Sequence, residues 1–321
     1  MIEVQHLTKK YGKHLALDDL SFTIEKGQIY GFLGPNGAGK STTMNIMTGY
    51  ISATSGEVLI DGHSILDEPE KAKKSTGYLP EIPPLYLDMT VMEYLKFVAE
   101  LKKIPKDKRS AEVRKASTLV KLNDVSNRLI RNLSKGYKQR TGLAAAVLGF
   151  PDIIILDEPT VGLDPKQIIE IRQLIRKLAK DHTVILSSHI LAEVQEICDY
   201  VLIISKGKLV GSGTPEELEE LSHGKDSIEL TVKSDADTIQ SVLDRIDGIQ
   251  NVTWKNQGAD SCDLLVDTSK SAQEVCEDIS IAFATERIPV TRINILKATL
   301  EDIFLELTES SQKDEEGETK R

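Results

Sequence analysis

Gly34-Pro-Asn-Gly-Ala-Gly39-Lys40-Ser41 is the stretch that decides the fold of this chain. It fits the pattern GxxxxGK[ST] and follows a short apolar segment, residues 28–33, that predicts a buried strand. Residues 40–48 then have a helical pattern that Gly49 would close. A strand, a glycine-rich turn and a helix in this order predict a phosphate-binding loop. This context disfavours the alternative, which is a chance match to the pattern.

This loop predicts two cofactors, ATP and Mg²⁺. Glycines let several backbone N–H groups point at one anion, and the helix that follows adds the positive end of its dipole. Lys40 is placed to reach the β- and γ-phosphates of ATP, and Ser41 to hold Mg²⁺. The nucleotide-binding residues that we expect here are Gly34, Pro35, Asn36, Gly37, Ala38, Gly39, Lys40, Ser41 and Thr42.

A second site signal is Ile153-Ile-Ile-Leu-Asp157-Glu158-Pro159, an apolar strand that ends in two carboxylates. In α/β sheets ligands bind at the carboxyl ends of the strands. Asp157 suits a role at Mg²⁺, and Glu158 suits that of a general base that polarises the attacking water. Acidic residues also follow strands in ordinary turns, so the phosphate loop upstream is what favours the functional interpretation.

The composition sets limits on the function. The chain has 321 residues, enough for two domains, and its 40% hydrophobic and 28% charged residues are typical of a soluble globular protein. A net charge of −10 argues against a nucleic-acid-binding protein, which would be basic. The sequence predicts no transmembrane segment, no export signal and no metal cluster at Cys198, Cys262 and Cys276, so we expect a cytoplasmic location with reduced thiols.

A third signal is Leu133-Ser-Lys-Gly-Tyr-Lys-Gln-Arg140, which lies between the phosphate loop and the acidic strand. With Gly162-Leu-Asp164-Pro165 and Ser187-Ser-His189, these motifs occur in the order seen in ABC ATPases. The chain resembles that family over residues 1–220. The resemblance implies that Ser134 and Gly136 contact the γ-phosphate held by a second subunit and that Asp164 lies at the dimer interface. It also implies that His189 touches the γ-phosphate and the catalytic base, so the predicted catalytic residues are Glu158 and His189.

Two further positions are interpreted through the same resemblance. Tyr11 matches the aromatic that stacks on adenine, although an edge-strand aromatic is the simpler alternative. Gly77-Tyr-Leu-Pro-Glu81 has Glu where the family usually has Gln, and Glu81 would reach Mg²⁺ or its water while adding negative charge near the phosphates. The predicted metal-site residues are Ser41, Asp157 and Glu81.

Several departures from the usual family pattern narrow the resemblance. Lys135 and Tyr137 replace a glycine and a glutamine of the usual LSGGQ motif. With Glu81, these residues make the chain similar to the ATP-binding subunits of ABC-2-type exporters, which include the gliding-motility and CcmA-like groups. Such proteins often carry an additional C-terminal domain, and the end of that domain resembles residues 299–307 of this chain.

The remaining pattern predicts the domain organisation. Residues 1–222 are expected to form an α/β phosphate-loop NTPase cassette with a mixed sheet, an antiparallel β subdomain and a helical insertion at about 82–140. Thr90 and Glu93 predict a capping box at the start of a helix there. Residues 226–308 have the order βαββαβ, which predicts a small α+β domain of ferredoxin-like type, with a final helix capped by Thr299 and Asp302. We expect residues 309–321 to be a disordered charged tail.

Together these signals predict an ATP-hydrolysing motor subunit of a membrane transporter. ATP would close a head-to-tail dimer, homo- or heterodimeric, that drives a separate integral-membrane permease from the inner face of the cell membrane. The alternatives are a soluble ABC ATPase that acts on the ribosome or DNA, and a regulatory module that hydrolyses nothing. The single phosphate loop and the acidity of the chain disfavour the former, and Glu158 and His189 disfavour the latter.

Overall fold

The computed structural model describes residues 1–220, 226–258, 261–296, 301 and 304. They divide into two compact units, Met1–Pro215 and a smaller one that begins at Glu216, and each is described by itself. The expected boundary between residues 222 and 226 falls in a segment outside the described residues. So do the expected cap residues Thr299 and Asp302 and the expected tail 309–321.

The first unit is built on a six-stranded sheet in the order β10-β9-β3-β8-β7-β6. The bounds of these strands are Ile29–Leu33 (β3), Thr76–Leu79 (β6), Ile153–Leu156 (β7), Thr183–Ser188 (β8), Tyr200–Ser205 (β9) and Lys208–Gly213 (β10). β10 alone pairs antiparallel. β3, β7 and β8 are buried at every position, as expected for parallel strands covered on both faces. Because β3, β8 and β7 are neighbours, the loops that follow them meet at one edge of the sheet.

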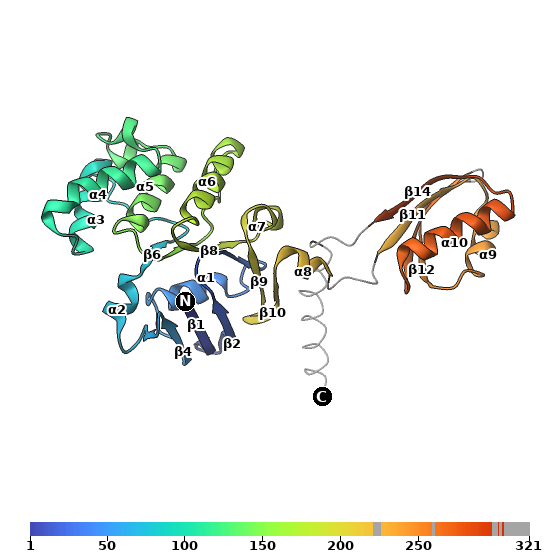
Figure 1. The fold of residues 1–321 in the computed structure, drawn as a ribbon, viewed down its shortest axis with the longest axis horizontal. Coiled ribbons are helices and arrows are strands. Elements are labelled where there is room, and N and C mark those ends of the chain that lie inside the picture. Colours follow the sequence, from blue (N-terminus) through green and yellow to red (C-terminus); the bar gives the residue numbers. More distant parts are fainter. Residues whose placement is uncertain (221–225, 259–260, 297–300, 302–303, 305–321) are drawn as a thin grey trace. The chain divides into compact units, whose positions relative to one another are not determined.

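Helices pack on this sheet, and a second sheet lies beside it in the same unit (Figure 1). The helices are α1 (Lys40–Met47), α6 (Pro165–Leu178) and α7 (Leu191–Ile197). The second sheet is antiparallel in the order β2-β1-β4-β5, with bounds Ile2–Tyr11 (β1), His14–Ile24 (β2), Ser55–Ile60 (β4) and His63–Ser64 (β5), and is followed by α2 (Pro69–Lys74). Met44 and Met47 of α1 join Phe22 and Phe32 in one buried core, which fixes the phosphate loop between the sheets.

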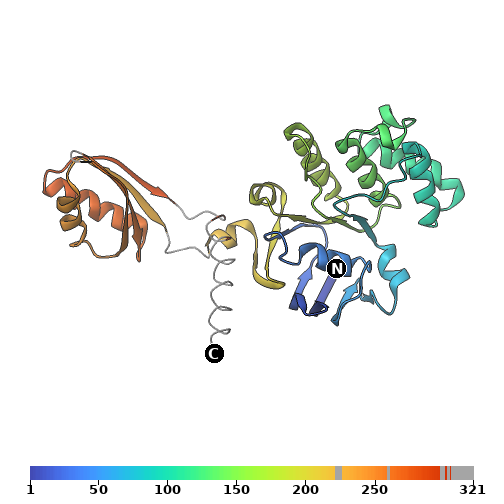
Figure 2. The same cartoon turned by 180° about the vertical axis from the view of Figure 1, so that it is seen from behind.

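A helical insertion interrupts the chain between β6 and β7. It contains α3 (Val91–Leu101), α4 (Lys106–Leu119), two short 3-10 helices (Asn123–Val125 and Ile130–Asn132) and α5 (Lys135–Val147). The predicted capping box is confirmed, because the Thr90 hydroxyl accepts from the Glu93 N–H and the Glu93 carboxylate accepts from the Thr90 N–H. Figures 1 and 2 show the three α-helices (green) gathered at one end of this unit, away from β1, β2 and β4.

The second unit has the predicted βαββαβ order. After α8 (Pro215–Glu220) come β11 (Ser227–Val232), α9 (Ala236–Leu243), β12 (Ile249–Gln257), β13 (Cys262–Thr268), α10 (Ala272–Thr285) and β14 (Val290–Leu296). The strands form one antiparallel sheet in the order β12-β13-β11-β14, which is the ferredoxin-like arrangement. Alternate residues of β11 and β13, for example Leu230 and Leu264, are buried on the side of the sheet that packs on α9 and α10. With Phe283 of α10 they belong to a separate hydrophobic core.

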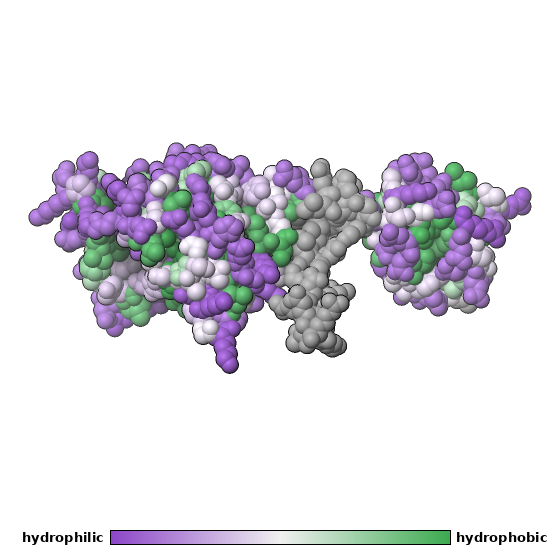
Figure 3. Space-filling model, turned by 90° about the horizontal axis from the view of Figure 1, so that it is seen from below, coloured by the Kyte–Doolittle hydropathy of each residue, from purple (hydrophilic) through white to green (hydrophobic). Residues whose placement is uncertain are grey.

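The surface carries a mixture of polar and apolar residues. On the face drawn in Figure 3, hydrophilic residues predominate in each unit, and apolar residues form separate patches among the hydrophilic ones. In the part of the chain that the structure describes, no helix combines the length and the apolar character needed to cross a bilayer.

Candidate nucleotide-binding and catalytic site

The phosphate loop turns tightly between β3 and α1. Gly39, which precedes the helix, has φ 109°, a left-handed conformation that residues with a side chain rarely adopt. A Cβ atom at this position would lie 2.7 Å from Leu17 Cδ2 and 2.9 Å from the Ala16 carbonyl oxygen. The loop is therefore held against β2 in a form that only glycine fits, and its amides are presented at the start of α1.

Lys40 is buried with its ammonium group inside this loop, at 6% exposure. Its Nζ donates to the carbonyl oxygens of Gly34 at 2.7 Å and Pro35 at 3.2 Å, and lies 3.9 Å from Glu158 Oε1. Burial lowers the pKa of Lys40, and the nearby Glu158 and Asp157 carboxylates oppose that shift. A buried ammonium group held mainly by backbone carbonyls is ready to interact with an anion that enters the loop.

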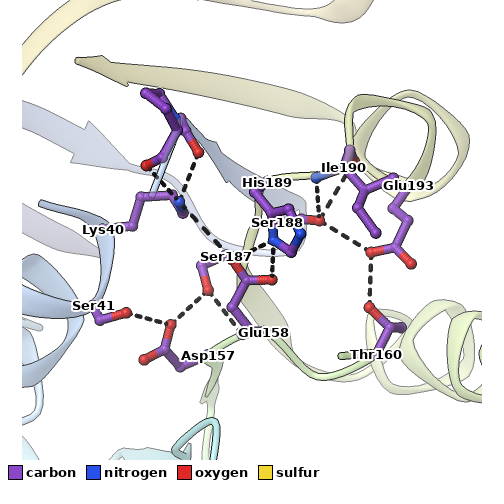
Figure 4. A network of polar contacts seen from close by, with 12 residues as sticks. Lys40, Ser41, Asp157, Glu158, Thr160, Ser187, Ser188, His189, Ile190 and Glu193 are labelled. Carbon is purple, nitrogen blue, oxygen red and sulfur yellow. Dashed lines mark hydrogen bonds and ion pairs between the residues drawn. The ribbon is translucent and has the colours of Figure 1, made fainter. Parts of the chain in front are cut away.

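Asp157 and Ser41 meet at the end of β7. Asp157 Oδ1 accepts from Ser41 Oγ at 3.1 Å and from Ser187 Oγ at 2.6 Å (Figure 4). Asp157 is 3% exposed, so its carboxylate is fixed by these two hydroxyls rather than by water. The Ser41 hydroxyl at the start of α1 and the Asp157 carboxylate after β7 are the kinds of oxygen ligand that Mg²⁺ prefers.

Glu158 and His189 form a pair beside Lys40. His189 Nδ1 lies 3.1 Å from Glu158 Oε1 and 3.0 Å from Oε2. Glu158 has φ 47°, which is uncommon for a residue with a side chain and which the surroundings must hold. Its N–H donates to Ser187 Oγ at 2.8 Å, so Ser187 secures both carboxylate-bearing residues. The pair has the geometry of a base and the group that orients it.

A cleft of about 380 Å³ brings most of the predicted site residues together. It is lined by Tyr11, Asn36, Gly37, Ala38, Gly39, Lys40, Ser41, Thr42, Glu81, Glu158 and His189, together with His14, Ala16 and Val161. Gly34 and Pro35 contribute through the carbonyl oxygens that hold Lys40. Tyr11 is 49% exposed at the rim, where Lys9 Nζ lies 5.0 Å from its ring centre.

Ser134, Gly136 and Asp164 are not among the residues that line this cleft. Ser134 caps α5 by accepting from Tyr137 N–H, and Asp164 caps α6 by accepting from Gln167 N–H at 2.9 Å. Gly136 joins the two helix ends, because a Cβ there would lie 2.4 Å from Gln167 Oε1. Ser134 and Asp164 are exposed and Gly136 is buried against Gln167, so the three predicted residues lie at the N-termini of α5 and α6, apart from the lining of the cleft.

The residues present fit ATP and Mg²⁺. Backbone amides, a buried ammonium group and a helix N-terminus converge on the loop, which suits a polyphosphate. Ser41 and Asp157 supply two oxygen ligands, and Mg²⁺ usually takes its others from water and phosphate. Glu81 is exposed and is one of the residues that line the cleft.

Sequence reasoning missed several residues of the site. The Ser187-Ser-His189 motif assigns no role to Ser187, yet its hydroxyl donates to Asp157 and accepts from the Glu158 N–H. His14, Ala16 and Val161 line the cleft from segments without a recognisable motif. Glu193, buried in the first turn of α7, had no signal in the sequence beyond its place five residues after Ser188.

The fold and the cleft define a phosphate-loop ATPase, and comparisons with known proteins agree. Residues 17–161 match the family model described as ABC transporter. The ATP-binding protein YhcH of Bacillus subtilis, an ABC transporter protein, is 34% identical over 100% of this chain and 97% of its own length. The chain belongs to the family of ABC transporter ATP-binding subunits.

Two further comparisons cover the cassette. The bacitracin transport ATP-binding protein BcrA of Bacillus licheniformis is 41% identical over 65% of this chain and 68% of its own length. A dimeric ATP-binding cassette, solved in a post-hydrolysis state with ADP and Pi, superposes with TM-score 0.61 and 26% identity. That match covers 67% of this chain and 98% of the other, so the predicted cassette fold is confirmed.

Proposed function

We propose that this protein is the ATP-hydrolysing motor subunit of an ABC-2-type exporter. In this proposal two cassettes close head-to-tail around ATP, and each offers the surface formed by Ser134, Gly136 and Asp164 to the phosphate loop of the other. The observation that carries the proposal is the separation of that surface from the cleft of its own chain. The similar cassette that was solved as a dimer with ADP and Pi supports dimer formation.

Each site residue has a defined part in hydrolysis. The loop amides and Lys40 bind and orient the phosphates, and Ser41 and Asp157 would hold Mg²⁺, which supplies electrostatic stabilisation of the developing charge. Glu158 accepts the proton of the attacking water, and His189 keeps the Glu158 carboxylate turned toward the γ-phosphate. Tyr11 stacks on the adenine at the rim.

Closure must be transmitted to a membrane subunit. A second cavity of about 580 Å³ lies between the sheet and the helical insertion, lined by Glu81, Pro83, Tyr94 and Lys102 among others. Ile82, Tyr86 and Leu87 are exposed beside it, at 82%, 55% and 49%. This apolar rim is the contact surface that we assign to the permease, and it would place the protein at the inner face of the cell membrane.

Co-purification tests the proposal. A tagged full-length chain, expressed in its own host and extracted in mild detergent, should bring down one integral-membrane chain in stoichiometric amount. Charged substitutions at the rim, Ile82→Glu with Leu87→Glu, should abolish this association while ATP binding stays unchanged. Ile281→Glu, at an exposed apolar residue of the second unit, serves as the control. Recovery with ribosomes and without a membrane chain would overturn the exporter assignment.

A further inference from the structure

Glu193 is a buried carboxylate that lies behind the catalytic residues. It is 3% exposed and belongs to the first turn of α7. Its Oε2 accepts from Thr160 Oγ1 at 2.8 Å and from Ser188 Oγ at 3.0 Å (Figure 4). Thr160 stands two residues after Glu158, and Ser188 stands immediately before His189. One oxygen atom therefore joins the two loops that carry the proposed base and its partner.

Ser188 sets the turn that contains His189. Its hydroxyl oxygen accepts from the Ile190 N–H at 3.0 Å, which closes the backbone around His189. The single hydroxyl proton is then donated to Glu193, the nearer of its two acceptors; the other, the Ile190 carbonyl oxygen, is at 3.4 Å. Glu193 thus fixes the direction in which this hydroxyl points, and with it the geometry of the turn.

Thr160 secures the other loop. Glu158 holds a left-handed conformation at φ 47°, and such a conformation persists only where neighbouring contacts impose it. The Val161 N–H donates to the Glu158 carbonyl oxygen and the Leu163 N–H to that of Thr160, so residues 158–163 form a closed turn. The bond from Thr160 to Glu193 attaches this turn to α7.

The second oxygen of Glu193 faces a positive charge. Oε1 lies 3.5 Å from Arg172 on α6, which also pairs with the more exposed Glu196. Oε1 and Arg172 Nε are both buried without a hydrogen-bond partner. A buried ion pair with incomplete hydrogen bonding contributes little to stability, so stability alone is a poor reason for this carboxylate.

We infer that Glu193 is a positioning residue that couples the Glu158 loop to the His189 loop, and that Arg172 keeps it turned toward them. This inference rests on the proposed roles of Glu158 and His189. It predicts that catalysis needs the acceptor atom at position 193 more than it needs the charge. A glutamine carbonyl oxygen can still accept from both hydroxyls, whereas alanine cannot.

Full-length Glu193→Ala and Glu193→Gln separate the two requirements. Both variants leave the buried Arg172 without the carboxylate of Glu193, so both should lower Tm, because removing one partner of a buried pair is destabilising even where the intact pair contributes little. Only the alanine variant loses the link, and we expect its kcat to fall about tenfold or more while KM for ATP stays within about twofold, because small displacements of positioned groups slow catalysis strongly. The glutamine variant should retain kcat within about threefold. Glu196→Gln, which removes the ion pairs of the more exposed Glu196 with Arg172 and Arg176 but leaves Glu193 in place, is the matched control.

Thr160→Val and Ser188→Ala test the inference if the alanine variant at position 193 fails to fold. Each removes one hydroxyl and should lower kcat, and the double variant should be no slower than the slower single one, because either loss breaks the link. Additive losses, equal kcat in Glu193→Ala and wild type, or kcat that follows Tm in both position-193 variants would overturn the inference. Glu158→Gln, assayed in parallel, reports on the proposed function separately: hydrolysis by that variant contradicts the base role whatever position 193 does.

Discussion

At the residue scale, the site depends on backbone conformations that are unusual for the residues concerned. Gly39 at φ 109° ends the loop between β3 and α1, and Glu158 at φ 47° lies in the turn that follows β7. The first turns the loop amides toward the phosphates, and the second turns a carboxylate toward Lys40 at 3.9 Å. The catalytic geometry is therefore held by the sheet and its neighbours rather than by the reacting side chains themselves.

Replacing Tyr11 tests adenine stacking. Tyr11→Ala should raise the Kd for ATP about tenfold, since stacking of a base on an aromatic ring contributes about 1–3 kcal/mol. Tyr11→Phe should bind like the wild type, because the ring face is retained. Titration with a fluorescent ATP analogue measures both. An unchanged Kd in the alanine variant would contradict stacking on adenine and would favour the alternative that Tyr11 is an ordinary aromatic residue of an edge strand.

Replacing Glu81 tests the charge that this residue places at the cleft. Glu81→Gln should lower the Kd for MgATP a few-fold at low ionic strength, because one negative charge near the phosphates is removed. The difference should shrink in high salt, where exposed charges are screened. Titrations at two salt concentrations decide this point. A higher Kd in the variant would instead make Glu81 a direct participant in metal binding.

At the element scale, the features that could be predicted are the strands and helix ends that depend on neighbouring residues in the sequence. The strands at residues 153–156 and 200–205 and the Thr90–Glu93 box follow from apolar runs and capping chemistry, and all are present. The contact of Gly136 with Gln167 and the bond of Glu193 with Thr160 join segments far apart in the chain. No local pattern encodes such pairs, because they depend on how α5, α6 and α7 pack.

The capping box offers a test of the helical insertion. Thr90→Ala removes the side-chain acceptor for the Glu93 N–H and should cost about 1 kcal/mol. In a unit of this size that loss corresponds to a Tm lower by about 2–4 °C. Thermal unfolding followed by circular dichroism measures it, with Thr90→Ser as the control that retains the cap. An unchanged Tm would mean that tertiary packing alone fixes the start of α3.

At the scale of the whole molecule, each unit has its own core. The cluster around Phe32 and Met44 lies in the first unit, and the cluster around Leu230 and Phe283 lies in the second. The site residues belong to the first unit.

Truncation after Ser222 tests this division. The remaining chain should fold, bind ATP with an unchanged Kd and hydrolyse it, because its core and cleft are complete without the second unit. Thermal unfolding, nucleotide titration and size-exclusion chromatography check each point. Loss of hydrolysis with ATP binding intact would assign the second unit to dimer closure.

We expect ATP to close a dimer in which each site is completed by Ser134 and its neighbours from the other subunit. Glu158→Gln should abolish hydrolysis, at least about 10²-fold for loss of a general base, and so preserve the closed state. Ser134→Asp, added to this variant, keeps a good N-cap for α5 but sets a negative charge against the γ-phosphate of the partner.

Size-exclusion chromatography with light scattering measures the outcome most directly. Glu158→Gln is predicted to be monomeric with ADP and dimeric with MgATP, and Glu158→Gln with Ser134→Asp is predicted to bind MgATP yet remain monomeric. A dimer that forms equally with ADP and ATP, or one that persists with Ser134→Asp, would contradict the account.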